Sequence, residues 1–192
     1  MKKVPEDLIL NALQTPNIMA AVVCADEESL LESIKHVTEN KLIIPILIGN
    51  KEKILNISKN INFSTDGLSI INKKNVIDCA STACDLAKKN KIQIIIKGNL
   101  HTDILMRTFL KKEFSLIEGK RLSHIWYMSS DKLKKPIFIS DGALNVLPRL
   151  DVKLHILKNV VEFANKTGLT KPKVAILSGP EDPIESLPSS VE

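Results

Sequence analysis

The sequence predicts an α/β protein in which a mostly parallel sheet lies between helices, in a three-layer α/β/α arrangement. The first observation is a set of short apolar runs without polar alternation, such as MAAVVC and IQIII, which are typical of strands buried in a parallel sheet. The second is that amphipathic stretches with helical spacing separate these runs. Each crossover between parallel strands is therefore expected to be right-handed.

The elements expected in the first two-thirds of the chain alternate in this way, after a leading helix over residues 4–14. Strands are expected at 19–24, 43–49, 67–71 and 92–96. Helices are expected after the N-cap Asp26, near Lys51, over 75–89 and near His101.

The pattern changes after Gly119, where strands are expected at 121–128 and 136–140, joined by a lysine-rich loop. A long helix is expected over 149–166, with Gly168 at its C′ position. Its inward side chains would be Leu150, Leu154, Leu157, Val161 and Ala164. A further buried strand is expected at 173–178, followed by a loop. We expect two domains, 1–120 and 121–192, the second being only the start of an α/β domain.

Composition excludes several classes of protein. With 44% hydrophobic and 26% charged residues, the chain is an ordinary globular one. The net charge of +5 comes from scattered lysines without interleaved aromatic residues, so it indicates a solvated surface rather than a nucleic-acid partner, although a positive field helps attract polyanions. No apolar run approaches a membrane span or a signal peptide, so a cytoplasmic location is expected.

The three cysteines predict neither a disulfide framework nor a zinc site, because their number is odd and no CxxC spacing occurs. Cys79 and Cys84 fall in a helical pattern and are expected to be small core residues. No metal site is expected.

The first candidate site is KGNLHT, which follows an expected strand and begins a helix. Open α/β sheets bind ligands at that edge, and the first free N–H groups of a helix can hold an anion. Gly98 permits a sharp turn, while Lys97 and Arg107 add positive charge. A guanidinium suits phosphate because it donates two parallel hydrogen bonds. The alternative is a plain strand-to-helix turn, with Arg107 paired to Asp103 one turn earlier.

Two histidines stand out for their positions. His101 lies at the loop–helix junction beside Thr102, where it could cap the helix, bind a ligand or transfer a proton. His124 alternates with Leu122 and Trp126 on one strand face, which is typical of an interior or cleft histidine with its hydrogen bonds satisfied.

Two more polar loops follow expected strands. In SDGALN, Asp141 ends a strand and Asn145 lies in the loop beyond it, although Asp and Gly are also common in turns for backbone reasons alone. In LSGPED, Ser178 could donate to a ligand or cap a turn. The three loops together could converge on one cleft.

Four stretches in order carry a resemblance to a known family: KGNLHTDILMRTFL from Lys97, GKRLSH from Gly119, SDGALNVLPRL from Ser140 and KVAILSGPEDPIESLPSS from Lys173. Together they resemble the phosphate acetyl/butyryltransferase family, with more similarity to its butyryl branch. The opening DEESLLESI and IPILIG stretches fit the same family, so the resemblance extends over essentially the whole chain.

The resemblance implies reversible transfer of an acetyl or butyryl group between CoA and phosphate. The CoA thiol attacks the carbonyl of an acyl phosphate, positive groups hold the phosphate and a base assists the thiol. CoA, acyl phosphate and inorganic phosphate are thus the implied ligands, with CoA a substrate and no tightly bound cofactor. The implied fold is like that of isocitrate and isopropylmalate dehydrogenases, two α/β domains usually assembled as a homodimer.

By motif match, Arg107 takes the position of an anion-binding arginine of the family. His101, Thr102, Asp141 and Asn145 match its cleft-lining loops. We therefore expect His101 and Asp141 as catalytic candidates and the following as binding residues: Lys97, Gly98, Thr102, Arg107, Asn145 and Ser178.

Relatives of this family continue beyond the last matching stretch, and that continuation holds the aspartate thought to assist the thiol. We therefore expect the C-terminal part of the family fold to lie outside this chain, which would expose apolar sheet surface. The chain would be a truncated enzyme, half of a split enzyme completed by a C-terminal fragment, or a non-catalytic interaction module. A dinucleotide-binding oxidoreductase is disfavoured because no GxGxxG fingerprint occurs.

Overall fold

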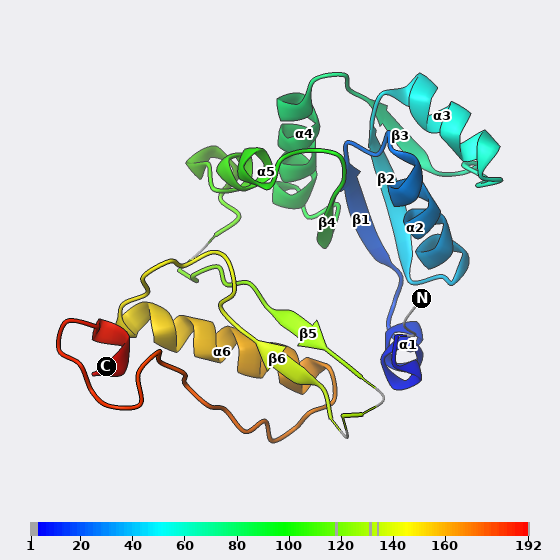
Figure 1. Ribbon diagram of the computed structural model, residues 1–192. Helices are drawn as coiled ribbons and strands as arrows, with labels where there is room; N and C mark the ends of the chain where they lie inside the picture. The colour runs from blue at the N-terminus through cyan, green and yellow to red at the C-terminus, as the bar shows by residue number, and fades with distance from the viewer. Residues whose placement is uncertain (1–3, 118, 131, 134, 192) are drawn as a thin grey trace. The chain divides into compact units, whose positions relative to one another are not determined.

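The computed structural model of the 192-residue chain describes residues 4–117, 119–130, 132–133 and 135–191. The chain divides into a larger compact unit, residues 6–118, and a smaller one that combines residues 1–5 with 119–192 (Figure 1). Each unit is described by itself below.

The larger unit alternates helices and strands. Its elements are α1 (Glu6–Leu13), β1 (Ile18–Val23), α2 (Glu28–Glu39), β2 (Ile43–Gly49), α3 (Lys51–Asn60), β3 (Ser69–Asn72), α4 (Val76–Lys88), β4 (Ile94–Lys97), α5 (Thr102–Phe109) and the 3-10 turn η1 (Lys112–Phe114). All the helices and strands expected in this part of the chain are present, within a few residues of the expected bounds.

The sheet of the larger unit has four parallel strands in the order β3-β2-β1-β4. Ala21 of β1 pairs with Ile46 on one side and with Ile95 on the other. The chain thus builds outward from β1 through β2 to β3 and then returns to the opposite side of β1 with β4. The predicted α/β class with a mostly parallel sheet is confirmed.

Two hydrophobic cores fill the larger unit, one on each face of the sheet. Side chains alternate along β1, so that Val22 enters one core while its neighbours Ala21 and Val23 enter the other. The core around Val22 is covered by α2 and α3, and the opposite core by α4 and α5 (Figure 1). The unit therefore has the three layers that the uninterrupted apolar strands predict.

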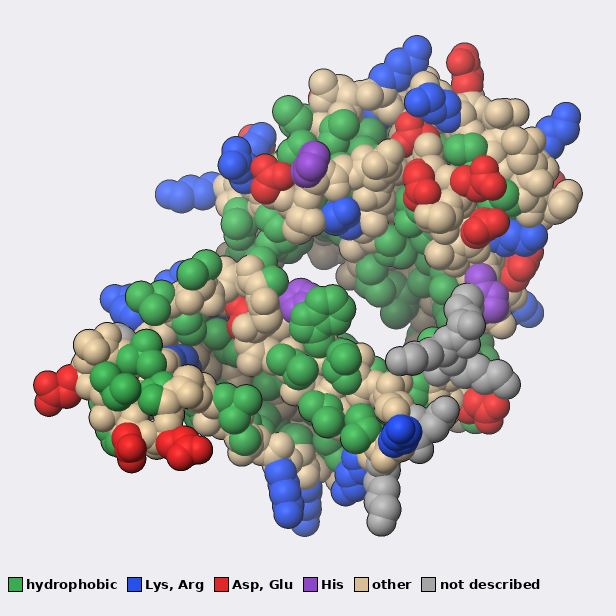
Figure 2. Space-filling model, viewed as in Figure 1, with side chains coloured by type: hydrophobic (Ala, Val, Ile, Leu, Met, Phe, Trp, Pro, Cys, Tyr) green, Lys and Arg blue, Asp and Glu red, His purple; other side chains and the backbone are tan. Residues whose placement is uncertain are grey.

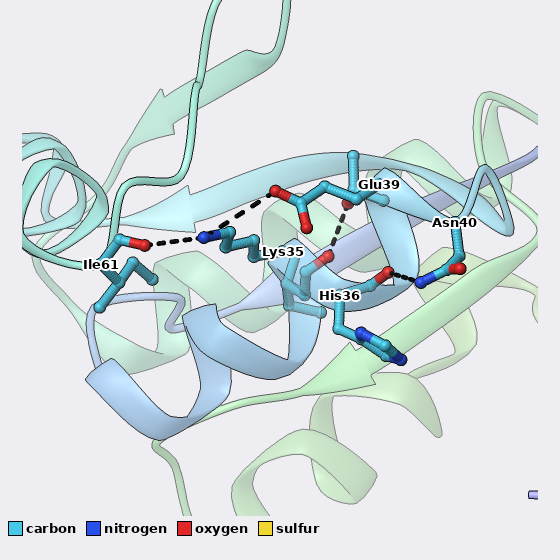
Figure 3. A network of polar contacts seen from close by, with 7 residues as sticks. Lys35, His36, Glu39, Asn40 and Ile61 are labelled. Carbon is cyan, nitrogen blue, oxygen red and sulfur yellow. Dashed lines mark hydrogen bonds and ion pairs between the residues drawn. The ribbon is translucent and has the colours of Figure 1, made fainter.

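Side-chain caps fix where the helices of this unit begin. Asn50 accepts from Lys53 N at 3.2 Å, and Asn75 accepts from Ile77 N at 2.8 Å. For α2 the N-cap is Glu27, one residue after the expected Asp26. Lys35 of α2 donates to the carbonyl oxygen of Ile61, the C-cap of α3, at 2.9 Å, and this hydrogen bond joins the two helices (Figure 3).

All three cysteines are free and buried, as expected of small core residues. Burial raises the pKa of the Cys24 thiol to about 12 and that of the Cys84 thiol to about 11. The Cys79 thiol also has a raised pKa, with burial as the main cause. In the described part of the chain, no helix is long and apolar enough to cross a membrane.

The smaller unit holds an antiparallel pair of short strands, one long helix and a final 3-10 turn. The elements are β5 (Trp126–Met128), β6 (Ile137–Ile139), α6 (Leu150–Lys166) and η2 (Pro188–Ser190). The helix has its expected bounds, and Gly168 follows it with a φ of 95°, as a C′ glycine does.

Three expectations for the smaller unit are wrong in whole or in part. The strand expected at 121–128 is confined to Trp126–Met128. The segment 173–178 is not a strand. The inward face of α6 is only partly as expected. Ala164 is buried, but Leu150 and Leu154 are 52% and 49% exposed, and Val152 and Ile156 are the buried residues of the first turns. The helix is oriented by polar contacts as well as apolar ones: Asn159, on the same face, donates to the Ser123 hydroxyl at 2.9 Å.

Candidate functional site

The carboxyl ends of β1 and β4 form the first part of the candidate site. The chain leaves β1 toward β2 and comes back to β1 with β4, so these two strands flank the point where the strand order reverses. Open α/β sheets bind ligands at such a point. The loops there are held together by backbone hydrogen bonds, from Gly98 N to Val23 O at 2.9 Å and from Asn99 N to Cys24 O at 3.2 Å.

Gly98 is the residue that allows this close approach. A Cβ atom at that position would lie 2.4 Å from Val23 O, 2.6 Å from Cys24 O and 2.6 Å from Leu30 Cδ2. Two of the three clashing atoms belong to backbone carbonyl groups, which a rotamer change cannot move. The glycine of KGNLHT is therefore required for loop packing, whatever it does toward a ligand.

An open hollow of about 290 Å³ lies beside this glycine, between the end of β4 and the start of α2. Its lining residues are Glu27, Ser29, Leu30, Ser33, Lys97, Gly98 and Asn99.

Two charged groups of opposite sign line this hollow. Lys97 is exposed, and its ammonium group donates to Gly98 O at 3.3 Å. Glu27 accepts hydrogen bonds from Ser29 N at 3.2 Å and from Leu30 N at 3.1 Å. The hydrogen bond from the Ser29 hydroxyl is the main cause of the lowered pKa of Glu27. The N-terminus of α2 is thus already occupied by a carboxylate.

The N-terminus of α5 is different because no side chain caps it. The N-cap residue is His101, whose side chain makes no capping hydrogen bond. His101 and Thr102 are both exposed. A helix start without a side-chain cap leaves N–H groups available to an anion.

Arg107 lies in the last turn of the same helix. Its guanidinium is 3.8 Å from the Asp103 carboxylate, and the two side chains are 83% and 58% exposed. The paired alternative left open by the sequence is therefore what the structure contains. Exposed ion pairs of this kind contribute little free energy, so the pair leaves the guanidinium accessible.

Asp141 and Asn145 of the smaller unit form a compact hydrogen-bonded loop. The Asp141 carboxylate accepts from Asn145 N at 2.9 Å, from Ala143 N at 3.2 Å and from Leu144 N at 3.3 Å. It also accepts from the Asn145 side-chain amide. The turn interpretation of SDGALN thus accounts for most of what these two side chains do.

The same loop joins two of the family-like stretches. Asp141 accepts from His124 N at 3.0 Å, and Asn145 donates to Leu122 O at 3.0 Å. Ser140 donates to His124 O at 2.8 Å. GKRLSH and SDGALN, which lie apart in the sequence, are therefore one structural feature.

The electrostatics of Asp141 favour its ionised form. Burial alone would raise its pKa, but hydrogen bonds from Asn145 and from backbone N–H groups outweigh burial, and the pKa is lowered. A carboxylate with a lowered pKa is a weak proton acceptor near neutral pH. Its hydrogen bonds suit it to shaping the loop.

The expectation that the hydrogen bonds of His124 are satisfied is wrong. Its Nδ1 atom is buried and has no hydrogen-bond partner among the described residues. Its ring lies edge-on to Trp126 with centroids 4.8 Å apart. A Cβ atom on Gly142 would come within 3.4 Å of Nδ1. The spacing SHIW shows which residues share the strand face but carries no signal of the unsatisfied nitrogen.

Ser178 does not follow a strand, so one of the three loops expected at strand ends is not one. Ser178 is exposed, and its hydroxyl lies 3.1 Å from that of Ser189. The described residues contain no group of three or more His, Cys, Asp and Glu side chains that could hold a metal ion.

The predicted site residues thus fall into three groups. Lys97, Gly98, His101, Thr102 and Arg107 lie together at one edge of the larger unit or on the helix that follows. In the smaller unit, one loop holds Asp141 and Asn145. Ser178 lies apart in the same unit, outside any helix or strand.

A four-stranded parallel sheet with a hydrophobic core and helices on each face defines the larger unit as an α/β protein. Two solved structures have this fold. A branched-chain phosphotransacylase from Enterococcus faecalis V583 matches with a TM-score of 0.73 at 24% identity, over 91% of this chain and 60% of that one. A phosphotransacetylase from Streptococcus pyogenes matches with a TM-score of 0.76 at 18% identity, over 92% of this chain and 63% of that one.

Sequence comparison identifies the family. The family described as phosphate acetyl/butaryl transferase matches residues 72–181, more than half of the chain, and the chain belongs to it. Phosphate butyryltransferase of Clostridium acetobutylicum is 31% identical over 172 residues, which are 90% of this chain and 57% of that protein. Phosphate acetyltransferase of Rickettsia felis is 34% identical over 188 residues, which are 97% of this chain and 54% of that protein. The chain therefore spans little more than half the length of these relatives.

Proposed function

We propose that this chain provides the ligand-binding part of a phosphate acyltransferase, which transfers a short acyl group between CoA and phosphate. The observation that carries the proposal is the α5 region, where an uncapped helix start and an accessible arginine lie on one short helix. Lys97 adds a second exposed cation at the end of β4, the strand that precedes this helix. Phosphate groups are the ligands that such positions bind best.

In the proposed reaction, the CoA sulfur forms a bond to the acyl carbon while the bond from that carbon to the phosphate oxygen breaks. The thiol proton must leave as the sulfur attacks. His101 is the candidate proton acceptor of this chain, because it is exposed at the N-terminus of α5 and makes no capping hydrogen bond. Asp141 and Asn145 are proposed to shape the loop of the smaller unit through their hydrogen bonds to one another, to His124 and to Leu122.

The proposal is tested by CoA binding, measured by calorimetry on the purified chain. Arg107→Ala is expected to weaken CoA binding by about tenfold or more, because a charged hydrogen bond to phosphate is lost. Arg149→Ala is the matched control. Arg149 is also exposed, at 79%, and lies 3.7 Å from a nearby carboxylate of Asp151. Equal affinity in the two variants would contradict the assignment of Arg107.

Turnover is measured separately, as acyl-CoA phosphorolysis with acetyl-CoA and butyryl-CoA, following free thiol. Turnover that is lost in His101→Ala would identify this chain as sufficient for the reaction. CoA binding without turnover would favour the second candidate function, a half-enzyme that binds ligand and needs further polypeptide. The match to only 57% and 54% of two relatives favours this second candidate.

A further inference from the structure

The ring of His124 lacks the partners that a buried polar group normally has. The hydrogen bonds that join His124 to the other described residues run through its backbone N–H and carbonyl groups. The ring atom Nδ1 is buried without a partner among these residues. Buried polar atoms are nearly always paired, so an unpaired one calls for a physical reason. Of the two ring nitrogens only Nδ1 is both buried and unpaired, which leaves Nε2 as the atom that a ligand can reach.

The backbone of His124 is fixed by the SDGALN loop. Its N–H group donates to the Asp141 carboxylate at 3.0 Å, and its carbonyl oxygen accepts from the Ser140 hydroxyl at 2.8 Å. The carbonyl oxygen of Leu122 accepts from the same loop at 3.0 Å. The strand β5 begins only at Trp126. Side chains therefore hold segment 121–124 where a strand ladder would otherwise do so.

The helix α6 holds the same segment through a different side chain. The amide group of Asn159 donates to the carbonyl oxygen of Arg121 at 2.8 Å and to the Ser123 hydroxyl at 2.9 Å. Segment 121–124 is thus fixed by two separate elements of the smaller unit. A side chain on such a segment loses little conformational entropy when a ligand binds, which favours binding.

The His124 ring also has little room to turn. It lies edge-on to the Trp126 ring, with centroids 4.8 Å apart. A Cβ atom on Gly142 would lie 3.4 Å from Nδ1 and 3.1 Å from Trp126 Nε1, so the glycine leaves room for the ring pair. Figure 2 shows hydrophobic side chains gathered over the part of the smaller unit that holds β5 and β6. Next to apolar surface, a hydrogen bond from a charged ring is stronger than in water.

The charges near the ring favour an anionic ligand. Lys120 and Arg121 belong to the same stretch of chain and are exposed. Among the described residues Arg121 has no carboxylate partner, whereas Arg107 and Arg149 each pair with one. The Asp141 carboxylate accepts three backbone N–H groups of its own loop, which stabilise its negative charge. Positive charge is therefore available at this segment.

We infer that His124 is an anion-contacting residue of the smaller unit, and that its Nε2 atom donates a hydrogen bond to inorganic phosphate. The inference rests on the proposed function for the identity of the anion, because phosphate is a substrate of the proposed reaction. The contacts that support it all lie in the smaller unit, apart from the α5 region of the larger one. A phosphate oxygen that accepts from Nε2 would favour the charged form of the ring.

Sulfate is the probe, because it is a tetrahedral oxyanion that stays doubly charged near neutral pH. Trp126 is the reporter, because it is the single tryptophan of the chain and contacts the His124 ring. A charged imidazole quenches an indole that it touches. At about pH 6 we expect sulfate to lower the Trp126 emission in a saturable way, and inorganic phosphate to compete. Chloride at the same ionic strength should have no such effect, and an equal response to chloride would overturn the inference.

The sulfate response should weaken at about pH 8, because an imidazole loses its charge between these values. The other charged groups near the ring keep their charge over this range. They are Lys120 and Arg121 of the same segment, Asp141 of the loop, and Glu162 of α6, which interacts with Lys120. Hydrogen bonds lower the pKa of both carboxyl groups, although burial opposes this for Asp141. A response that is equal at both pH values would overturn the inference.

Two glutamine variants separate His124 from the rest of the unit. His124→Gln is expected to weaken sulfate binding by about tenfold or more, because a charged hydrogen bond is lost. His155→Gln is the matched control, since His155 lies on α6 of the same unit, and it is expected to leave sulfate binding unchanged. Equal affinities in the two variants would overturn the inference.

The unaltered chain provides a measurement that needs no variant. It has four histidines, so their ring signals can be followed one by one by nuclear magnetic resonance. Sulfate should shift the ring signals of His124 and leave those of His36 and His155 in place. Sulfate binding without a shift at His124 would overturn the inference, as would displacement of sulfate by CoA, because the site would then take a nucleotide phosphate. Neither titration uses turnover or an acyl group, so a failure of the proposed function is seen separately, in CoA binding and phosphorolysis.

Discussion

Replacing Gly98 by alanine should destabilise the larger unit more than the same change at other glycines of the chain. The added Cβ would meet two backbone carbonyl oxygens at 2.4 and 2.6 Å and the Leu30 side chain at 2.6 Å. Overpacking of this kind costs about 1–3 kcal/mol. Moving β4 away from β1 would also weaken the hydrogen bond from Gly98 N to Val23 O, worth about 1 kcal/mol. We expect a loss of about 3 kcal/mol in the free energy of unfolding.

The assay is urea unfolding followed by far-ultraviolet circular dichroism, with two alanine variants as a graded reference. A Cβ on Gly49 would lie 3.1 Å from Ala25 N, so Gly49→Ala should cost less, about 1 kcal/mol. A Cβ on Gly179 would meet nothing within 4 Å, so Gly179→Ala should be neutral or slightly stabilising. For Gly98→Ala, the urea midpoint should fall by about 1–3 M. A Gly98 variant as stable as the Gly179 variant would refute the argument from close packing.

Two further predictions concern titrating groups. The pKa of Asp141 is lower in the folded chain than its unfolded value of about 3.9. The ionised carboxylate therefore stabilises the fold at a pH above about 3.9, and this stabilisation is lost as the pH falls through the folded pKa. Asp141→Asn should therefore destabilise the smaller unit at neutral pH, as measured by unfolding monitored through Trp126 fluorescence. A difference in the free energy of unfolding between the two proteins that stays constant down to the lowest pH would contradict this. The cysteines have raised pKa values, so Cys24, Cys79 and Cys84 should react with a thiol reagent only on unfolding, and stability should fall above the unfolded thiol pKa of about 8.5. Rapid labelling of the folded chain would count against the buried positions.

Local sequence pattern predicts the larger unit well because its elements have their partners within the same stretch of chain. Asn50 and Asn75 mark helix starts, and the apolar runs become strands that pair with one another. The N-cap of α2 was misplaced by one residue because Asp26 and Glu27 both carry a carboxylate. Only the structure shows which one reaches the free N–H groups.

The smaller unit shows what pattern alone cannot supply. Residues 173–178 have strand composition, but a strand also needs a neighbour, and none pairs with them in the described chain. The stripe from Leu150 to Ala164 predicts which helix face is apolar but not which surface it meets. Among the site residues, the Asp103–Arg107 pair follows from the spacing in the sequence. The sequence leaves open whether His101 caps α5, and the unsatisfied nitrogen of His124 depends on contacts across the hairpin.

The strand order of the larger unit has a consequence for how the chain is made. As the chain leaves the ribosome, β1 can pair with β2 and β2 with β3 soon after each is synthesised, because these neighbours are close in sequence. The other side of β1 waits for β4, and the contact between Met19 N and the Gln93 side chain joins residues 74 positions apart. Contacts of such high order form slowly. Until β4 emerges, a nascent chain presents one open edge of its central strand, and a translational pause before Ile94 would prolong its exposure to wrong strand partners.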